Sequence, residues 1–260
     1  MQKVKNYRWS PVLGDFEDSP EKIWGVKPYD PESLEPCVFC GVYGLPDFYA
    51  LWRYKGEKHI FWTGSDIRHF RNGYWLDGKG IIKLDPQPLA NWISQNCISW
   101  VENSVERDAL KVFGIESLVV PSFLGDVKKF TPQLIDPKPR YYSSVSGNDF
   151  QLYGWDKINE MAWRNPDTEY HLYGNTVPWI GPENVIVHGR VSKEQMNEEV
   201  KSMTGCVRAV EFEGCSEILV KSVLWGQKPI SLIDYPFLHS DNPREALLNS
   251  LNKYDFNSNI

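Results

Sequence analysis

Hydrophobic runs alternate with amphipathic runs along most of the 260-residue chain. Short apolar runs bounded by turn residues are typical of buried strands, whereas apolar positions three or four apart are typical of helices packed on one face. Predicted strands lie at residues 37–43, 59–62, 97–101, 118–120, 140–145, 169–173, 184–188, 207–210 and 229–232. Predicted helices lie at residues 47–54, 88–94, 105–113, 151–163, 192–203, 216–225 and 242–252. This alternation predicts an α/β fold with parallel sheets.

The pattern is interrupted at residues 126–139, which carry three lysines, among them Lys128 and Lys129, and three prolines without any periodicity. Such a stretch is the best candidate for a linker. We therefore expect two Rossmann-like domains, residues 1–137 and residues 138–240, facing a cleft. Residues 241–260 form a C-terminal helix that could cross back to the first domain. In such sheets, ligands bind beyond the carboxyl ends of the strands.

Composition narrows the function classes. The net charge is 28 − 34 = −6, which gives no general attraction to nucleic acid or to an anionic membrane. No apolar run approaches the ~20 residues that span a bilayer, and residues 1–8 lack the apolar core of a signal peptide. Five cysteines are too few, and odd in number, for a disulfide framework. We expect a cytoplasmic protein, with peripheral membrane association left open.

Cys37 and Cys40 form a C-x-x-C pair. A zinc site needs four ligands, and no second pair or nearby histidine completes one, so we expect no metal. Buried apolar side chains are the favoured interpretation of this pair. A redox pair is the alternative.

The segment from Cys206 to Ile230 is the most informative part of the sequence. It consists of a strand, an acidic turn with glycine (Glu213-Gly214), a helix, Gly226 and a final strand. This segment resembles the donor-binding region of GT-B glycosyltransferases, especially the retaining family 4-like group (glycosyl transferases group 1). Upstream, residues 153–158, 166–174 and 183–192 are similar to further motifs of that group in the same order, and residues 61–67 and 99–115 are more weakly similar.

The resemblance implies two Rossmann-like domains and the transfer of a hexose, with retention and without an essential metal. The donor would be a UDP- or GDP-sugar, and the acceptor a hydroxyl of a glycan, a lipid-linked molecule or another compound. GT-B enzymes usually have distinctly more than 260 residues. We therefore expect a pared-down acceptor domain within residues 1–137.

Physical chemistry supports a donor site at the start of the predicted helix 216–225. Unpaired N–H groups at a helix N-terminus bind anions such as a diphosphate, and the turn residues Gly214 and Cys215 leave the main chain accessible. Glu213 can accept hydrogen bonds from sugar hydroxyls. Ser216 is an N-cap or a phosphate contact, and Glu217 is a donor contact or a first-turn acid that complements the helix dipole. Gly174 and Gly189 close two strands at the same predicted edge.

The chain departs from the resemblance at two places. The glutamate that holds the nucleotide ribose in the family falls at Lys221, and an ammonium group has no lone pair for a ribose hydroxyl. The ribose is then bound differently, the lysine meets a phosphate, nucleotide binding is lost, or the lysine is a solvated helix-face residue. Residues 143–149 also lack the family's phosphate-binding bases. Arg190 and Lys193 are either substitutes or surface residues.

Acceptor-side candidates lie at the ends of two predicted strands in the first half. Asp66 follows Gly64 and Ser65, and it is expected either to orient or deprotonate the acceptor hydroxyl or to cap the next helix. Glu102 and Asn103 are the second candidates. Trp62 and Trp179 are weaker candidates for sugar stacking, since most large aromatic residues fill cores.

The resulting hypothesis is a glycosyltransferase with Glu213 and Asp66 as its catalytic residues. One alternative, motivated by the two departures, is a degenerate, non-catalytic module that binds a sugar or a nucleotide. Another is a DNA-base glucosyltransferase of viral type, against which the acidic net charge argues.

Overall fold

The computed structural model describes residues 3–13, 20–77 and 79–251. The chain divides into two compact units. The first comprises Met1–Asp126, Phe212–Cys215 and Leu248–Ile260, and the second comprises Val127–Glu211 and Ser216–Leu247. The boundary after Asp126 falls within the stretch expected to be a linker. However, the backbone N–H of Gln133 donates to the carbonyl oxygen of Trp225 at 2.9 Å, and the rest of this stretch, from Val127 on, belongs to the second unit.

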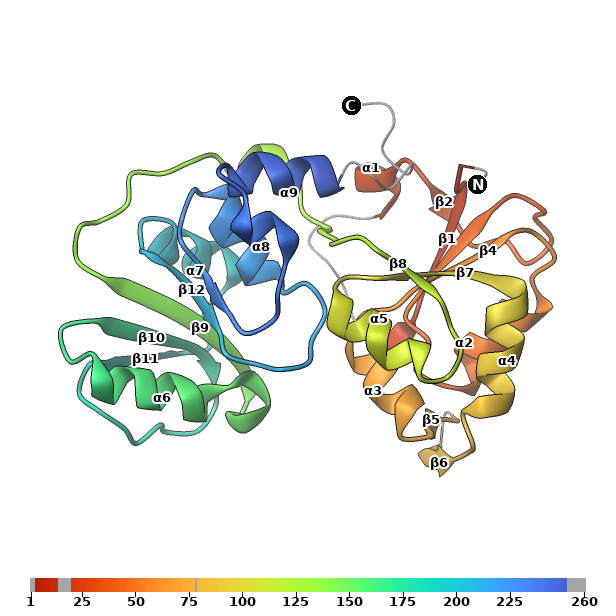
Figure 1. Cartoon of the computed structure of the whole chain (residues 1–260), viewed down its shortest axis with the longest axis horizontal. Helices are drawn as coiled ribbons and strands as arrows, with labels where there is room; N and C mark the ends of the chain where they lie inside the picture. Colours follow the sequence, from red (N-terminus) through yellow and green to blue (C-terminus); the bar gives the residue numbers. More distant parts are fainter. Residues whose placement is uncertain (1–2, 14–19, 78, 252–260) are drawn as a thin grey trace. The chain divides into compact units, whose positions relative to one another are not determined.

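The first unit is built on a six-stranded parallel sheet (Figure 1). Its strands, in spatial order, are β2 (Lys27–Pro28), β1 (Asn6–Trp9), β3 (Cys37–Cys40), β4 (Lys58–Phe61), β7 (Cys97–Val101) and β8 (Ser117–Val119). The connections carry helices α1 (Pro20–Trp24), α2 (Leu45–Arg53), α3 (Ser65–Arg71), α4 (Gln87–Asn96) and α5 (Ser104–Lys111). A small antiparallel hairpin, β5 (Tyr74–Leu76) and β6 (Ile81–Lys83), follows α3.

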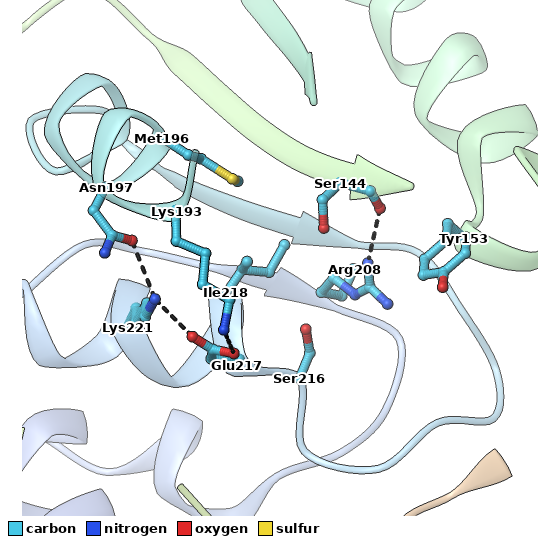
Figure 2. Close-up of a pocket in the computed structure, with 10 residues that line it drawn as sticks. All are labelled: Ser144, Tyr153, Lys193, Met196, Asn197, Arg208, Ser216, Glu217, Ile218 and Lys221. Carbon is cyan, nitrogen blue, oxygen red and sulfur yellow. Dashed lines mark hydrogen bonds and ion pairs between the residues drawn. The ribbon is translucent and has the colours of Figure 1, made fainter. Parts of the chain in front are cut away.

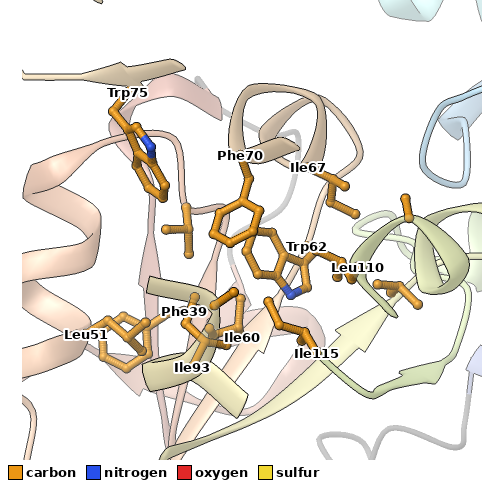
Figure 3. Close-up of a cluster of buried hydrophobic side chains, with 14 of the residues drawn as sticks. Phe39, Leu51, Ile60, Trp62, Ile67, Phe70, Trp75, Ile93, Leu110 and Ile115 are labelled. Carbon is orange, nitrogen blue, oxygen red and sulfur yellow. The ribbon is translucent and has the colours of Figure 1, made fainter. Parts of the chain in front are cut away.

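Both faces of this sheet are buried, as expected of parallel strands covered by helices. Successive side chains of β4 point to opposite faces: Ile60 joins a core with helix residues such as Leu51 and Phe70, and Phe61 joins a second cluster with Trp24. Figure 3 shows the first of these cores, in which Trp62 and Phe70 pack edge to face at 5.4 Å between ring centroids. Trp62 is fully buried, so its proposed role in sugar stacking is wrong.

The second unit has a five-stranded parallel sheet in the order β11 (Val185–Gly189), β10 (Glu169–Asn175), β9 (Arg140–Gly147), β12 (Gly205–Arg208) and β13 (Ile230–Ser231). Its helices are α6 (Trp155–Arg164), α7 (Lys193–Val200) and α8 (Glu217–Leu224), and α9 (Pro243–Leu251) follows. Short 3₁₀ turns include η3 (Gln151–Tyr153). In chain order the strands read 3-2-1-4-5. The order therefore reverses between β9 and β12, where doubly wound sheets bind ligands.

The expected α/β fold with Rossmann-like parallel sheets is confirmed. Most predicted elements are present, with their ends shifted by a few residues; for example, the strand predicted at 207–210 is β12, Gly205–Arg208. The helix α1, the strands β1 and β2 and the β5–β6 hairpin were not predicted. In β1 only the first of four residues is buried, so the strand lacks the apolar run that identifies its neighbours.

The C-x-x-C pair lies in β3, and both of its thiols are fully buried and free. The interpretation of these cysteines as small core side chains is confirmed. Within the described ranges, no helix is long and apolar enough to cross a bilayer.

Candidate functional site

A pocket of about 450 Å³ opens at the carboxyl edge of the second unit's sheet, where the strand order reverses (Figure 2). Its walls come from the end of β9, from η3, from α7, from the last residue of β12 and from the first turns of α8. The lining residues are Ser144, Tyr153, Lys193, Met196, Asn197, Arg208, Ser216, Glu217, Ile218 and Lys221. Three of them are cationic and one is a carboxylate, so the pocket favours an anion.

Arg208 ends β12 and is only 4% exposed. Its Nη1 donates to the carbonyl oxygen of Ser144 at 3.2 Å, and its guanidinium carbon lies 5.3 Å from the centroid of the Tyr153 ring. A planar guanidinium held in this way suits bidentate binding of a phosphate. The sequence interpretation missed this residue. The available signal was an arginine within the apolar run Cys206–Val210, at the strand end next to the expected switch point.

Lys221 is also 4% exposed, so the alternative of a solvated helix-face lysine is wrong. Its Nζ lies 2.7 Å from Oε1 of Glu217 and donates to Oδ1 of Asn197 at 3.2 Å. The same ammonium group lies 5.3 Å from the ring centroid of Phe130. The lysine is therefore compensated by a carboxylate, an amide oxygen and an aromatic face.

The start of α8 forms another wall of the pocket. Ser216 is the N-cap residue, yet its side chain makes no capping hydrogen bond. Its hydroxyl thus does not satisfy the first N–H groups of the helix, which suit an anion. Lys193 is exposed and lies 3.8 Å from Oε2 of Glu217, whereas Arg190 is exposed and does not line the pocket.

Gly174 and Gly189 lie near this edge without lining the pocket. Gly174 has φ +84°, and a Cβ there would lie 2.2 Å from the carbonyl oxygen of Val145, so the close approach requires glycine. Gly189 donates its N–H to Oδ1 of Asn175 at 3.2 Å. Trp179 packs against Phe150 at 4.9 Å between ring centroids. These contacts build the edge of the sheet.

The predicted residues Glu213, Gly214 and Cys215 lie in the first unit, as do all four predicted acceptor-side residues. Nδ2 of Asn103 donates to the carbonyl oxygen of Glu213 at 2.7 Å. The N–H of Cys215 donates to Oε2 of Glu102 at 2.8 Å. Gly64 is close enough that a Cβ on it would lie 2.5 Å from the nitrogen of Gly214.

Asp66 is fully buried in the first turn of α3. Its Oδ1 accepts hydrogen bonds from the N–H groups of Thr63 and Ile67, and its Oδ2 accepts one from the N–H of Val42. Burial nevertheless raises its pKa to about 7. Gly64, not Asp66, occupies the N-cap position of α3. The predicted contact of Asp66 with an acceptor stays a prediction.

Two further carboxyls are buried nearby, and burial is the main cause of the raised pKa of each. One belongs to Glu102 and the other to Glu106, which the sequence interpretation did not single out. The hydroxyl of Ser65 lies 2.6 Å from the hydroxyl of Tyr43. In the part of the chain that the structure describes, no three His, Cys, Asp or Glu residues are placed to hold a metal ion.

Neither family models nor curated proteins match the chain. Solved structures do. TarM matches with a TM-score of 0.54 and 13% identity over 85% of this chain and 49% of that chain. Sucrose-phosphate synthase from Thermosynechococcus elongatus matches with a TM-score of 0.53 and 13% identity over 84% of this chain and 63% of that chain.

Both of these proteins are GT-B glycosyltransferases. At this level of identity the likeness concerns the fold alone: this chain shares parallel, Rossmann-like α/β sheets with both proteins. The chain spans about half the length of TarM and less than two thirds of the length of the synthase.

Proposed function

We propose that the chain is a glycosyltransferase that moves a hexose from a UDP- or GDP-sugar to an acceptor hydroxyl, with retention of the anomeric configuration. The observation that carries the proposal is the cationic pocket at the reversal of strand order, between the ends of β9 and β12. The GT-B fold supports it independently. The acceptor is a hydroxyl of a glycan, of a lipid-linked molecule or of another compound.

In the reaction, the bond from the anomeric carbon to the diphosphate breaks, a bond to the acceptor oxygen forms, and the proton of the acceptor hydroxyl passes to the departing diphosphate. The departing diphosphate takes up negative charge. We assign stabilisation of that charge to Arg208, to Lys193 and to the first N–H groups of α8, since preorganised donors stabilise charge that develops in the transition state. The proposed reaction uses no metal ion. We assign to Glu213 the role of accepting hydrogen bonds from the sugar hydroxyls.

The compartment we propose is reducing and cytoplasmic. All five cysteines are free, and four of them are buried. Buried free thiols are compatible with a reducing environment.

The test is turnover. Purified protein is incubated with a panel of UDP- and GDP-sugars and with glycan and lipid-linked acceptors, and release of nucleoside diphosphate is measured. NMR of the product then reports the anomeric configuration. Release with retention for at least one donor is expected. Tight donor binding without release for any donor would leave a non-catalytic binding module and overturn the enzyme assignment.

A further inference from the structure

One side of the pocket in the second unit is built around a carboxylate. Glu217 lies in the first turn of α8, lines the pocket and keeps 39% of its side chain exposed. Its Oε1 lies 2.7 Å from Nζ of Lys221, and its Oε2 lies 3.8 Å from Nζ of Lys193. Two cations thus flank one carboxylate, and the Glu217 side chain is held between α7 and α8.

Lys221 fixes this carboxylate more tightly than Lys193 does. Lys221 is 4% exposed, and its Nζ donates a hydrogen bond to Oδ1 of Asn197 at 3.2 Å. A buried cation held by two partners has few alternative positions, so the carboxylate oxygen that it contacts is fixed as well. The 3.8 Å between Oε2 of Glu217 and Lys193 exceeds hydrogen-bonding distance. Oε2 accepts no hydrogen bond from Lys193, and it keeps lone pairs for hydroxyl groups of a bound molecule.

The opposite side of the pocket is cationic. Figure 2 shows Arg208, with Ser144 and Tyr153 beside it, away from Glu217 and the two lysines. Like charges repel, so the phosphate groups of a nucleotide belong beside Arg208 and Ser216 rather than against the Glu217 carboxylate. The part of the nucleotide that meets Glu217 must therefore donate hydrogen bonds.

Apolar side chains identify the hydroxyl groups that meet this carboxylate. Met196 of α7 and Ile218 of α8, the residue after Glu217, complete the pocket wall there. A flat base packs well against an adaptable methionine and an isoleucine, so the nucleoside belongs on this side of the pocket. The vicinal hydroxyls of the ribose are the donors that a nucleoside brings to a carboxylate.

We propose that Glu217 accepts hydrogen bonds from the 2′- and 3′-hydroxyls of the nucleotide ribose, and that Lys221 is a positioning residue that holds the Glu217 carboxylate for this contact. The pocket is thereby selective for ribonucleotides over deoxyribonucleotides. These roles rest on the proposed function, because they require a nucleoside diphosphate in the pocket. All the residues involved belong to the second unit.

The test compares each ribonucleotide with its 2′-deoxy form. Calorimetry measures Kd for UDP and 2′-deoxy-UDP, and for GDP and 2′-deoxy-GDP. Wild-type protein should bind the preferred ribonucleotide at least about tenfold more tightly than its deoxy form, because the deoxy form lacks a charge-assisted hydrogen bond. In Glu217→Ala this ratio of affinities should fall below about threefold. Glu211→Ala, at a side chain 82% exposed, is the charge-matched control and should keep the wild-type ratio.

Two further variants separate these roles from a loss of structure. Glu217→Gln keeps an oxygen that accepts a hydrogen bond from Lys221, but its hydrogen bonds to the ribose are neutral and weaker, so the ratio should fall at least about threefold. In Lys221→Met the carboxylate remains but loses the cation that fixes it, and the ratio should again fall at least about threefold. A purely structural role of Lys221 would weaken both members of a nucleotide pair equally and leave the ratio unchanged.

The results distinguish these roles from the proposed function. Equal affinities of wild type for a bound ribonucleotide and its deoxy form, or a wild-type ratio in both Glu217 variants, overturn the role of Glu217 and leave the proposed function intact. A wild-type ratio in Lys221→Met overturns the role of Lys221. Wild-type protein that binds none of the four nucleotides overturns the proposed function itself. A ratio reduced in both Glu217 variants and in Lys221→Met, and kept in Glu211→Ala, is the expected result.

Discussion

Substitution of Lys221 by glutamate distinguishes what the resemblance implies from what the structure implies. On the resemblance, Lys221→Glu restores the carboxylate that would hold a ribose. In the structure, Lys221 lies 2.7 Å from Oε1 of Glu217 and is 4% exposed. The new carboxylate would then face another carboxylate in a largely buried place. We therefore predict that Lys221→Glu damages the site.

The magnitude follows from two contributions. Removing the cation costs about 1–3 kcal/mol, below the range for a fully buried pair because the side chain of Glu217 is 39% exposed. The repulsion between the two carboxylates at positions 217 and 221 is relieved when one of them is protonated. For a glutamate of ordinary pKa this costs up to about 3–4 kcal/mol at pH 7. Lys221→Met should therefore lose about 1–3 kcal/mol of stability, and Lys221→Glu up to about 3–4 kcal/mol more.

The assay is urea denaturation of both variants at pH 5 and pH 8. The repulsion in Lys221→Glu requires two ionised carboxylates, so its deficit relative to Lys221→Met should shrink at pH 5, where protonation is cheaper. Calorimetry at pH 7.5 should show weaker binding of UDP and GDP by Lys221→Glu than by wild type. Wild-type stability combined with stronger nucleotide binding in Lys221→Glu would refute the reasoning.

Three other predictions follow from the same structure. Arg208→Met should weaken nucleoside diphosphate binding about 10- to 150-fold in calorimetry, since a charge-assisted hydrogen bond contributes ~1.5–3 kcal/mol; Arg164→Met, at a side chain 78% exposed, should bind like wild type, and equal affinities in the two variants would contradict the assignment. Burial lowers the pKa of His171 to about 4, so the unfolded chain takes up a proton that the folded chain lacks as pH falls from ~6.5 to ~4. His171→Leu should reduce this acid-induced loss of stability by up to about 3 kcal/mol. If the free energy of unfolding in urea falls with pH as steeply in His171→Leu as in wild type, the prediction is wrong. Gly64→Ala should lower the stability measured by thermal denaturation by about 2–4 kcal/mol, because the φ of Gly64 is +84° and the new Cβ would lie 2.5 Å from a main-chain nitrogen. Gly80 has open space around it, so Gly80→Ala is the control, and an equal loss of stability in both variants would contradict the prediction.

The sequence predicted the fold well where a strand is buried along its whole length and contains an apolar run. β3 and β12 are buried at every residue, so their hydrophobic runs stand out. β1 carries partly exposed positions and β2 has only two residues, so neither strand shows a hydrophobic alternation or an apolar run in the sequence. Strand ends shifted because hydrogen-bond pairing, not hydrophobicity, determines where a ladder stops.

The candidate site was predicted less completely, for a physical reason. Ser216, Glu217, Lys193 and Lys221 could be identified because they lie in the first turns of two predicted helices, residues 192–203 and 216–225. The partners of Glu213 and Cys215 lie 110 and 113 residues away, and no local pattern encodes contacts over such distances. An apolar strand ending in arginine was a local signal for Arg208, but its meaning depends on which strands are neighbours.

The central claim is that the pocket between β9 and β12 binds the diphosphate of a nucleotide sugar. Calorimetric titration of the wild-type protein with UDP- and GDP-sugars tests this most directly. The account predicts 1:1 binding of at least one of them, displaced by the matching nucleoside diphosphate and weakened by Arg208→Met. Absence of binding for every member of the panel at millimolar concentration would contradict it.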